Sequence, residues 1–456
     1  MARSPRTVDV AALLDARKLS PFNYKLIFLS WLITAFDGLD MMMVSFTAPY
    51  MRDELHLSTM MLGNVFSAGT LGMVLGGFFF SYLGDRIGRR PTVLLAAFAF
   101  GALTIATAQA NTYHELLILR FLDGLAIGGM LPLAWALNIE FVPKRMRGTV
   151  VAVIMMGYTI GSASAGPLTN LIAPAHGWEG VYLLGGISTL VCAVALFFSL
   201  PESVRFLVSK GIKPELVVST LKKVDPAFDI RADDEFILGD EKKIRVPFHP
   251  RQLFEGRLAI LTPLLWIAYA VSSLAIYFGS SWGPLVLEEL DVSRKTAALV
   301  ASFGGLLGAL AGMVLMRITD KHGPRSVALF PALAVPVLLL LGLGFVPDSL
   351  FLAVVVIQAI LIGGEHSAVI SISGIFYPSA IRASGGGWVA SVGKVGGVLG
   401  PVIGAMVLSS GVPVLRSYAF LAIPPAILCL AILAIARIVR GRVEHEIPPL
   451  DVVPAS

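Results

Sequence analysis

Long hydrophobic runs separated by short polar segments recur along the whole chain. A helix needs about 20 apolar residues to cross the hydrocarbon core of a membrane, and each of these runs is long enough. The pattern therefore predicts an all-α membrane protein with twelve spanning helices. The predicted spans cover residues 26–50, 60–83, 91–110, 115–140, 148–173, 178–200, 258–283, 294–318, 325–346, 349–374, 383–409 and 415–437.

The polar segments divide the predicted spans into two groups of six. The longest polar segment, residues 201–257, carries an acidic run at Asp233 and a basic pair at Lys242. We expect it to link two six-helix bundles on the cytoplasmic side. The predicted organisation is a cytoplasmic amino-terminal segment (1–25), a first bundle (26–200), the cytoplasmic linker (201–257), a second bundle (258–437) and a cytoplasmic tail (438–456).

Composition agrees with a membrane protein. Hydrophobic residues make up 56% of the chain and charged residues 14%, with a mean hydropathy of +0.80. Soluble domains carry about 25% charged residues. The excess of apolar surface has to face lipid, which argues against a soluble protein with a single core.

The basic residues predict the orientation. Of the 35 Lys and Arg residues, 29 fall in segments on the side of the amino terminus and two fall within spans. Only Arg52, Arg294, Lys295 and Arg416 fall on the opposite side. Because cytoplasmic loops carry the excess of basic residues, we expect both termini in the cytoplasm. The net charge of +5 then needs no nucleic-acid partner to explain it.

One motif occurs twice. Gly84-Asp85-Arg86-Ile87-Gly88-Arg89-Arg90 recurs as Thr319-Asp320-Lys321-His322-Gly323-Pro324-Arg325, a displacement of 235 residues. The same displacement relates Phe141, Pro143 and Arg147 to Phe376, Pro378 and Arg382. An offset shared by separate motifs indicates that one half of the chain is a copy of the other. Paired halves of this kind are typical of secondary transporters.

Each copy of the motif joins two antiparallel helices on the predicted cytoplasmic side. Its Gly permits a tight turn, and its Asp can cap the next helix or pair with an Arg of a neighbouring loop. We expect these charges to latch the inner ends of the bundles in one state only. The alternative is that basic loops simply stay inside and that Asp only caps. The predicted gating residues are Asp85, Arg86, Arg90, Glu140, Arg147, Asp320, Arg325 and Arg382, with Glu140 latched to Arg147.

The first span carries two carboxylates, Asp37 and Asp40. A spacing of three residues places both on one face of the helix. Each ionised group costs about 2.5–3.5 kcal/mol at the centre of a spanning helix. We therefore expect these residues to exchange protons or to contact the substrate. The alternative is a structural hydrogen bond to another helix.

Other ionisable residues also lie within predicted spans. Arg120 in the fourth span and Lys394 midway along the eleventh are predicted to bind an anionic substrate. Asp123, or an Asp of the first span, could instead simply neutralise Arg120, and Glu365 is a possible internal partner for Lys394. The pair Glu365 and His366 in the tenth span is predicted to be a second proton site or, equally, a local polar pair.

Aromatic and amide side chains complete the predicted substrate site. Tyr269 and Tyr277 share one face of the seventh span, and Trp135 and Asn138 lie in the fourth. Aromatic residues in spans more often face lipid or the core than a ligand. They are therefore the weaker part of the prediction.

Several strings resemble the major facilitator superfamily and, within it, the aromatic acid–proton symporter family. The paired Asp of the first span is the most specific of them. The strings are Asp37-Gly38-Leu39-Asp40, Gly84-Asp85-Arg86-Ile87-Gly88-Arg89-Arg90-Pro91, Arg120-Phe121-Leu122-Asp123-Gly124, Glu140-Phe141-Val142-Pro143-Lys144-Arg145-Met146-Arg147-Gly148, Pro201-Glu202-Ser203-Val204-Arg205-Phe206-Leu207 and Tyr377-Pro378-Ser379-Ala380-Ile381-Arg382-Ala383. Two positions depart from the family pattern. Pro324 and His322 interrupt the second loop motif, and Lys394 stands where Arg is expected, which removes bidentate carboxylate binding.

The resemblance implies alternating access between two bundles in a bacterial inner membrane. Spans 1, 4, 7 and 10 would line a central cavity, and spans 2, 5, 8 and 11 would form the seam between the bundles. We take the small-residue spacings Gly72/Gly76, Gly157/Gly161, Gly393/Gly397 and Gly396/Gly400/Gly404 as support for that seam.

By the same resemblance, the expected function is proton-driven uptake of a benzoate-like or hydroxybenzoate-like anion. The expected partners are that anion, protons and the lipid bilayer, with no cofactor or metal and with the monomer as the working unit. Another small organic anion, or export of a drug or metabolite, remains an alternative. Seven scattered His residues and two Cys residues give no enzyme-like or metal-binding cluster.

Overall fold

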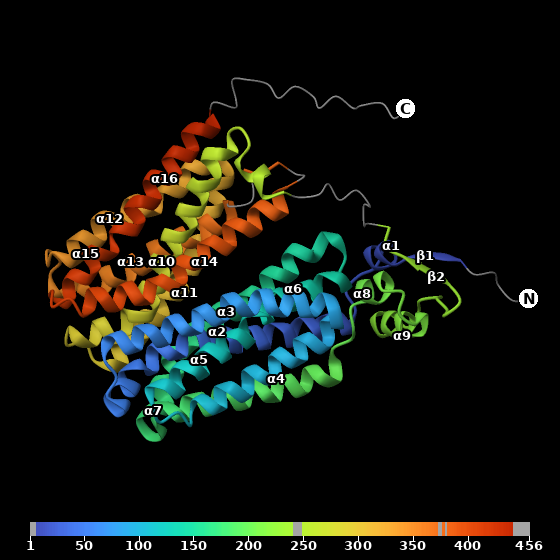
Figure 1. Cartoon of the computed structure of the whole chain (residues 1–456), viewed down its shortest axis with the longest axis horizontal. Coiled ribbons are helices and arrows are strands. Elements are labelled where there is room, and N and C mark those ends of the chain that lie inside the picture. The colour runs from blue at the N-terminus through green and yellow to red at the C-terminus, as the bar shows by residue number, and fades with distance from the viewer. Residues whose placement is uncertain (1–5, 240–248, 373–375, 379–380, 441–456) are drawn as a thin grey trace, which may run out of the picture. The chain divides into compact units, whose positions relative to one another are not determined.

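The computed structural model describes residues 6–239, 249–372, 376–378 and 381–440, and it is built almost entirely of helices (Figure 1). The elements before residue 240 are β1 (Thr7–Asp9), α1 (Val10–Asp15), α2 (Pro21–Leu55), α3 (Thr59–Ile87), α4 (Arg89–Thr107), α5 (Tyr113–Gly128), α6 (Met130–Phe141), η1 (Lys144–Met146), α7 (Arg147–Ser199), α8 (Val204–Ser209), α9 (Pro214–Val224) and β2 (Glu235–Ile237). Those after it are η2 (Pro250–Phe254), α10 (Leu258–Glu289), α11 (Arg294–His322), η3 (Pro324–Ala328), α12 (Leu329–Gly342), α13 (Asp348–Ile372), α14 (Arg382–Leu408), η4 (Val414–Arg416), α15 (Ser417–Leu421) and α16 (Ile423–Arg440).

The prediction of twelve spans is confirmed. Eleven helices of the described chain are long and apolar enough to cross a membrane. One of them, Lys144–Ser199, is 56 residues long and is interrupted at Gly177, whose φ of 67° is not helical. This single helix therefore holds the predicted spans 148–173 and 178–200.

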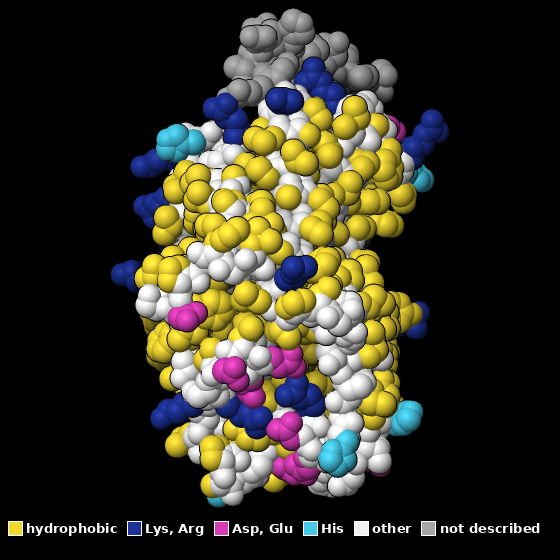
Figure 2. Space-filling model, turned by 90° about the vertical axis from the view of Figure 1, so that its left-hand side faces the viewer, with side chains coloured by type: hydrophobic (Ala, Val, Ile, Leu, Met, Phe, Trp, Pro, Cys, Tyr) yellow, Lys and Arg dark blue, Asp and Glu magenta, His cyan; other side chains and the backbone are white. Residues whose placement is uncertain are grey.

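Lipid-facing surface is visible on the molecule. Hydrophobic side chains cover most of the face shown in Figure 2, while acidic and basic side chains gather near one end of it. Phe198, for example, is 80% exposed and Leu171 is 76% exposed. Contiguous apolar surface of this extent is unusual for a soluble protein and is expected of helices surrounded by lipid.

The chain divides into two compact units. Unit 1 comprises Met1–Val246, Phe278–Leu306 and Val398–Val414, and unit 2 comprises Pro247–Tyr277, Leu307–Gly397 and Leu415–Ser456. Unit 1 thus contains α2 to α7 together with the ends of α10, α11 and α14. The predicted boundaries of the two six-helix bundles stay a prediction.

Glycine allows two pairs of helices in unit 1 to approach closely. A Cβ atom at Gly161 of α7 would overlap the carbonyl oxygen of Ala35 in α2. A Cβ atom at Gly124 of α5 would overlap the carbonyl oxygen of Gly69 in α3. These contacts hold α7 against α2 and α5 against α3, and α2 and α5 carry the buried charges described below.

The expected role of the small-residue spacings was wrong. Gly72 and Gly76 of α3 pack against α5, and Gly157 and Gly161 of α7 pack against α2. In the second half, Gly393 and Gly396 of α14 pack against α10. All of these contacts join helices of the same predicted half. The prediction failed because a stripe of small residues shows that a helix has a close neighbour without showing which helix that neighbour is.

Other small residues make the contacts that had been expected of a seam. Within unit 1, Gly63 of α3 lies against Pro401 of α14, and Gly166 of α7 lies against Ala298 of α11. Ser67 of α3 also donates a hydrogen bond to the carbonyl oxygen of Val398, at 2.7 Å. These pairs join spans 2 and 11 and spans 5 and 8.

Unit 2 has its own core. Buried side chains of α10, α11, α13, α14 and α16 pack in one cluster that includes Leu265, Ala368, Val389, Leu428 and Ile432. The turns of the duplicated motif are alike in the two units. Gly88 in unit 1 has a φ of 105° and Gly323 in unit 2 has a φ of 79°. Both values favour glycine, as the tight-turn prediction requires.

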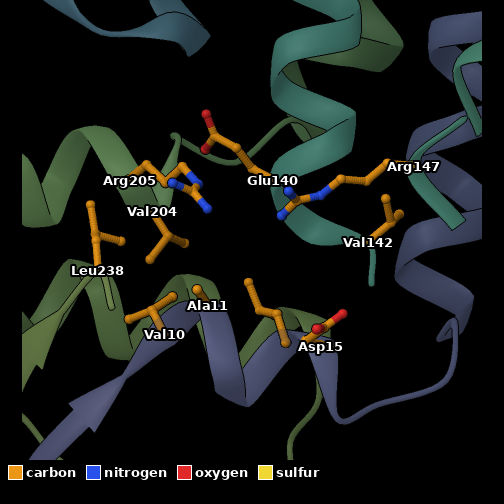
Figure 3. A pocket seen from close by; sticks show the side chains of 10 residues that line it. Val10, Ala11, Asp15, Glu140, Val142, Arg147, Val204, Arg205 and Leu238 are labelled. Atoms are coloured by element: carbon orange, nitrogen blue, oxygen red, sulfur yellow. The ribbon is translucent and has the colours of Figure 1, made fainter. Parts of the chain in front are cut away.

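The segment predicted to be a polar linker is partly folded. Residues 201–239 form α8, α9 and β2, and β2 pairs in parallel with β1 of the amino-terminal segment, with Val8 opposite Phe236. We call residues 6–20 and 201–239 the cytoplasmic cap, after the side of the membrane on which the sequence predicts them to lie. Its buried Val217 and Leu221 belong to the same apolar cluster as Leu29 of α2. Figure 3 shows side chains of both cap segments and of α6 meeting around one small pocket.

Candidate functional site

The buried charges of α2 and α5 form one cluster in unit 1. Arg120 Nη1 donates to both carboxylate oxygens of Asp40, at 2.9 and 3.2 Å, and to Asp123 Oδ2 at 2.7 Å. The side chains of Arg120, Asp40 and Asp123 are 3%, 3% and 0% exposed. Arg120 therefore does not reach toward water, and the structure brings the predicted Asp40 and Arg120 together.

Local sequence explains how three charged residues fit among packed helices. Gly69 of α3 lies beside the guanidinium, since a Cβ atom there would be in ordinary van der Waals contact, 3.9 Å from Arg120 Nε and Nη2. Thr104 of α4 donates to Asp123 Oδ1 at 3.3 Å. The three-residue spacing of Arg120 and Asp123 places both on one face of α5. A guanidinium with two carboxylate partners satisfies charges that would be too costly to bury singly.

Asp37 lies on the same face of α2, one turn before Asp40, and is 1% exposed. Neither of its carboxylate oxygens has a hydrogen-bond partner among the residues that the structure describes. An ionised carboxylate without a partner is among the most costly groups to bury. Asp37 therefore differs from Asp40 and Asp123, whose carboxylates are paired with Arg120.

A second polar group lies in unit 2. Glu365 of α13 is 0% exposed, and both of its carboxylate oxygens lack a partner within the described ranges. His366 Nδ1 lies 3.1 Å from Ser272 Oγ of α10, and the rings of His366 and Tyr269 meet edge to face at 5.7 Å. The structure thus brings together the predicted residues Tyr269 and His366.

Lys394 lies on α14 in the same unit. The preceding residue, Gly393, packs directly under the ring of Tyr269, so α14 is close to the aromatic residue predicted to bind substrate. Lys394 forms no ion pair in the described part of the chain, and the alternative pairing with Glu365 is not formed. Tyr277 lies two turns after Tyr269 on α10 and is half-buried.

The two remaining predicted substrate residues lie on α6. Asn138 donates to Ser30 Oγ of α2 at 2.7 Å and to the carbonyl oxygen of Ala134 at 2.8 Å. Trp135 is half-buried and packs with a small cluster that includes Val142 and Ile154. Asn138 therefore links α6 to α2, and a substrate contact for either residue stays a prediction.

The loops of unit 1 that are predicted to face the cytoplasm are joined through Glu140 of α6. Arg89 forms an ion pair with Glu140, and Ser203 of the cap donates to the other carboxylate oxygen. The predicted pair of Glu140 with Arg147 is not formed, although both residues line the pocket of Figure 3. The turn geometry at Gly88 presents Arg89 to Glu140, and neighbouring arginines in a motif cannot be told apart by spacing alone.

The cap also holds the loop that carries the first motif. Glu202 Oε1 accepts hydrogen bonds from the backbone N–H groups of Arg89 and Arg90, at 2.9 and 3.1 Å. Arg90 donates to the carbonyl oxygen of Phe197 at 2.9 Å. The sequence analysis did not predict Arg89, Glu202 or Ser203 as site residues. The string Pro201-Glu202-Ser203 was the available indication for the last two.

The other predicted gating residues are peripheral in this structure. Asp85, Arg86, Asp320 and Arg325 are exposed, and the two aspartates form no ion pair with any described residue. Arg382 donates to the carbonyl oxygen of Tyr377 at 3.3 Å. Their gating role stays a prediction.

A group of ion pairs at the predicted outer end was missed by the sequence analysis. Arg52 pairs with Glu289 at 2.8 Å, and Arg294 pairs with Asp53 at 3.0 Å. Arg294 also lies over the ring of Tyr50, 4.4 Å from its centroid. These contacts join α2 to the ends of α10 and α11 within unit 1.

Comparison with known proteins identifies the family that this sequence matches. The model of the Major Facilitator Superfamily matches residues 30–309 and 265–454. The 4-hydroxybenzoate transporter PcaK of Pseudomonas aeruginosa is 32% identical over 96% of this chain and 97% of that protein. A gallate transporter of Pseudomonas putida is 31% identical, over 94% and 95%. The benzoate transport protein of Acinetobacter baylyi is 28% identical, over 92% and 91%.

Solved structures agree on the fold. A bacterial homolog of the human lysosomal transporter Spinster superposes with a TM-score of 0.73 at 14% identity, covering 95% of this chain and 100% of that one. A D-xylose–proton symporter superposes with a TM-score of 0.71 at 17% identity, covering 90% and 97%. At these identities the likeness concerns the fold alone.

Proposed function

Because the chain belongs to the Major Facilitator Superfamily, we propose that it is a transporter that imports an aromatic carboxylate with a proton by alternating access. Relatives named for 4-hydroxybenzoate, gallate and benzoate support an aromatic acid as the substrate. The cluster of Asp37, Asp40, Arg120 and Asp123 is the observation that carries proton coupling.

The charges of this cluster do not balance when all its members are ionised. Three carboxylates would exceed the single guanidinium by two charges, in a site that is closed to water. Like charges in a buried site disfavour the ionised form, so at least one carboxyl group holds a proton. Asp37, which has no partner among described residues, is the first proton carrier in this proposal.

Asp40 provides the link between the proton and the substrate. When Asp40 takes up a proton, its ion pair with Arg120 weakens, and the guanidinium can bind the carboxylate of the substrate in its place. A planar guanidinium is suited to bind a carboxylate through two N–H donors. The exchange keeps the buried charge constant, which lowers the cost of closing the site to water.

Lys394 of unit 2 is a further substrate-binding residue in this proposal. Lys394 is a cation without an acidic partner among the described residues, and the residue before it, Gly393, packs against the ring of Tyr269. An ammonium group in a span needs an anion, and in this proposal the anion is the substrate carboxylate. Glu365 and His366 serve as a further proton site.

The membrane location and orientation in this proposal are inferred from the sequence. We place the protein in a bacterial inner membrane with both termini in the cytoplasm, on the support of its excess of basic residues in the loops on that side. The duplicated loops act as the inner gate, and the monomer is the working unit. One proton per monoanion makes transport electroneutral, and a second proton would add about 2.3 kcal/mol per 100 mV.

The test is uptake of labelled 4-hydroxybenzoate into proteoliposomes under an imposed pH gradient. We expect accumulation by the wild type and none by Asp37→Asn, which cannot exchange a proton at this position. The control is Asp348→Asn, which changes an exposed carboxylate at the start of α13 and should accumulate substrate normally.

Three results would count against the proposal. Full pH-driven accumulation by Asp37→Asn would remove this residue from the coupling. If non-aromatic carboxylates inhibit uptake as strongly as benzoate does, another organic anion is favoured as the substrate. If the gradient instead drives preloaded substrate out of the vesicles, an exporter is favoured.

A further inference from the structure

Arg120 has an uncharged neighbour that the mechanism above does not use. Tyr182, in the second part of α7, is 0% exposed. Its ring centroid lies 5.8 Å from Arg120 Cζ. A guanidinium within about 6 Å of an aromatic face is attracted by the ring, and the attraction is strongest where water is excluded.

Packing, and not the hydroxyl group, fixes this ring. Trp178, one turn earlier on α7, meets the ring of Tyr182 edge to face at 5.7 Å. The indole Nε1 of Trp178 donates to Glu54 Oε2 of α2 at 3.1 Å. The hydroxyl of Tyr182 is buried and has no hydrogen-bond partner in the part of the chain that the structure describes.

We infer that Tyr182 is a positioning residue for substrate binding. Its ring holds the guanidinium of Arg120 in place while Asp40 is protonated and the substrate carboxylate takes its position. This inference rests on the proposed function. It goes further by assigning a role to a residue outside the charged cluster.

The geometry explains why a ring suits this task. When Asp40 is neutral, the remaining charged partner of Arg120 is Asp123, on the same helix, and this partner alone would draw the guanidinium along α5. The ring attracts the cation from α7 without accepting any N–H donor in the way a carboxylate does. The N–H groups released by Asp40, and Nε, which has no described partner, stay available for the substrate.

The test compares variants with and without the aromatic face. Tyr182→Phe keeps the ring and removes a hydroxyl group that has no described partner, whereas Tyr182→Met fills similar volume without a ring. Initial rates of pH-driven 4-hydroxybenzoate uptake are measured against substrate concentration, with the reconstituted amount of each variant determined by immunoblot. We expect Tyr182→Phe to keep the wild-type KM and Tyr182→Met to raise KM by about five- to thirtyfold, with little change in maximal rate.

The split between KM and maximal rate separates positioning from folding. A purely structural role would lower the amount of protein and the maximal rate and leave KM unchanged, which would overturn the inference. Equal KM values for Tyr182→Phe and Tyr182→Met would also overturn it, whether both stay at the wild-type value or both rise. Tyr182→Leu replaces Tyr182→Met if the latter does not reconstitute. Absence of pH-driven uptake by the wild type would instead overturn the proposed function.

Discussion

Replacing Arg120 with Gln tests whether charge, and not shape, holds the buried cluster together. The change leaves Asp40 and Asp123 with side chains 3% and 0% exposed and without their cation. Removing one partner of a buried ion pair costs about 3–5 kcal/mol. We expect Arg120→Gln to lose free energy of unfolding in this range near neutral pH. The deficit should shrink as the pH falls, because protonated carboxyl groups no longer need the cation.

A neutral version of the same cluster provides the matched control. In Arg120→Gln combined with Asp40→Asn and Asp123→Asn, amide groups of similar shape replace all three charges. Replacing every member of a buried polar group together is far less costly than removing one of them. We therefore expect the triple variant to recover most of the lost stability and none of the pH-driven transport.

The measurement is unfolding of purified protein in one detergent, followed at several pH values. The single and triple variants are compared with the wild type, and each is then assayed for uptake. If the triple variant is as unstable as the single one at every pH, shape and not charge stabilises the cluster. If the triple variant transports normally, the buried charges have no part in coupling and the reasoning behind the proposed function fails.

Two further predictions concern packing and the cytoplasmic cap. Gly161→Ala should lower the free energy of unfolding by about 1–3 kcal/mol, because its Cβ would overlap the carbonyl oxygen of Ala35. The control is Gly148→Ala, which has open space around it and should have no such cost. Equal losses of stability in thermal unfolding of the two variants would refute the helix-contact argument. Asp15→Ala should weaken the hold of the cap by about 0.5–1.5 kcal/mol, because Asp15 Oδ1 accepts the backbone N–H of Lys144 at 2.7 Å. Limited proteolysis of residues 6–20 should speed up in Asp15→Ala and not in Asp15→Asn, whose amide oxygen still accepts, and equal cleavage rates would contradict this.

Run length and composition were enough to predict the spanning helices. An apolar run of about 20 residues has few alternatives to a membrane helix, so most boundaries follow from the sequence. The break at Gly177 was predicted as a loop between two spans, and the structure reduces that loop to a single non-helical residue. The pairing of Asp40 with Arg120 was also open to prediction, since buried opposite charges seek each other.

The cytoplasmic cap could not be predicted in this way. Strand β1 pairs with β2, and Thr7 lies opposite Glu235, a separation that no local pattern reveals. Helix α9 carries four buried residues in eleven, among them Val217 and Leu221. Lysines on its other face keep the mean hydropathy of the segment low, so the segment resembles a polar linker. Its apolar stripe at helical spacing was the available signal.

The partners of individual residues were predicted less well than their positions. Arg89, Arg90 and Arg147 are all basic residues of inner loops, and only Arg89 binds Glu140. The difference arises from the backbone at Gly88, where a φ of 105° sets the direction of the following residue. The glycine stripes pose the same problem, because small residues on a helix record a close contact and not the identity of the contacting helix.

The two cations within the spanning helices, Arg120 and Lys394, differ in a way that gives each unit its own task in the proposed cycle. Arg120 has two carboxylate partners in unit 1, so it can bind a substrate only after a proton releases one of them. Lys394 in unit 2 has no acidic partner among the described residues, so it can attract an anion before any proton moves. A substrate carboxylate that approaches Arg120 adds a negative charge to the cluster of unit 1, which favours protonation of Asp40. Binding and protonation then assist each other, because the proton and the anion together leave the charge of the cluster unchanged, whereas either one alone changes it. This mutual dependence is what tight coupling of a proton to an organic anion requires.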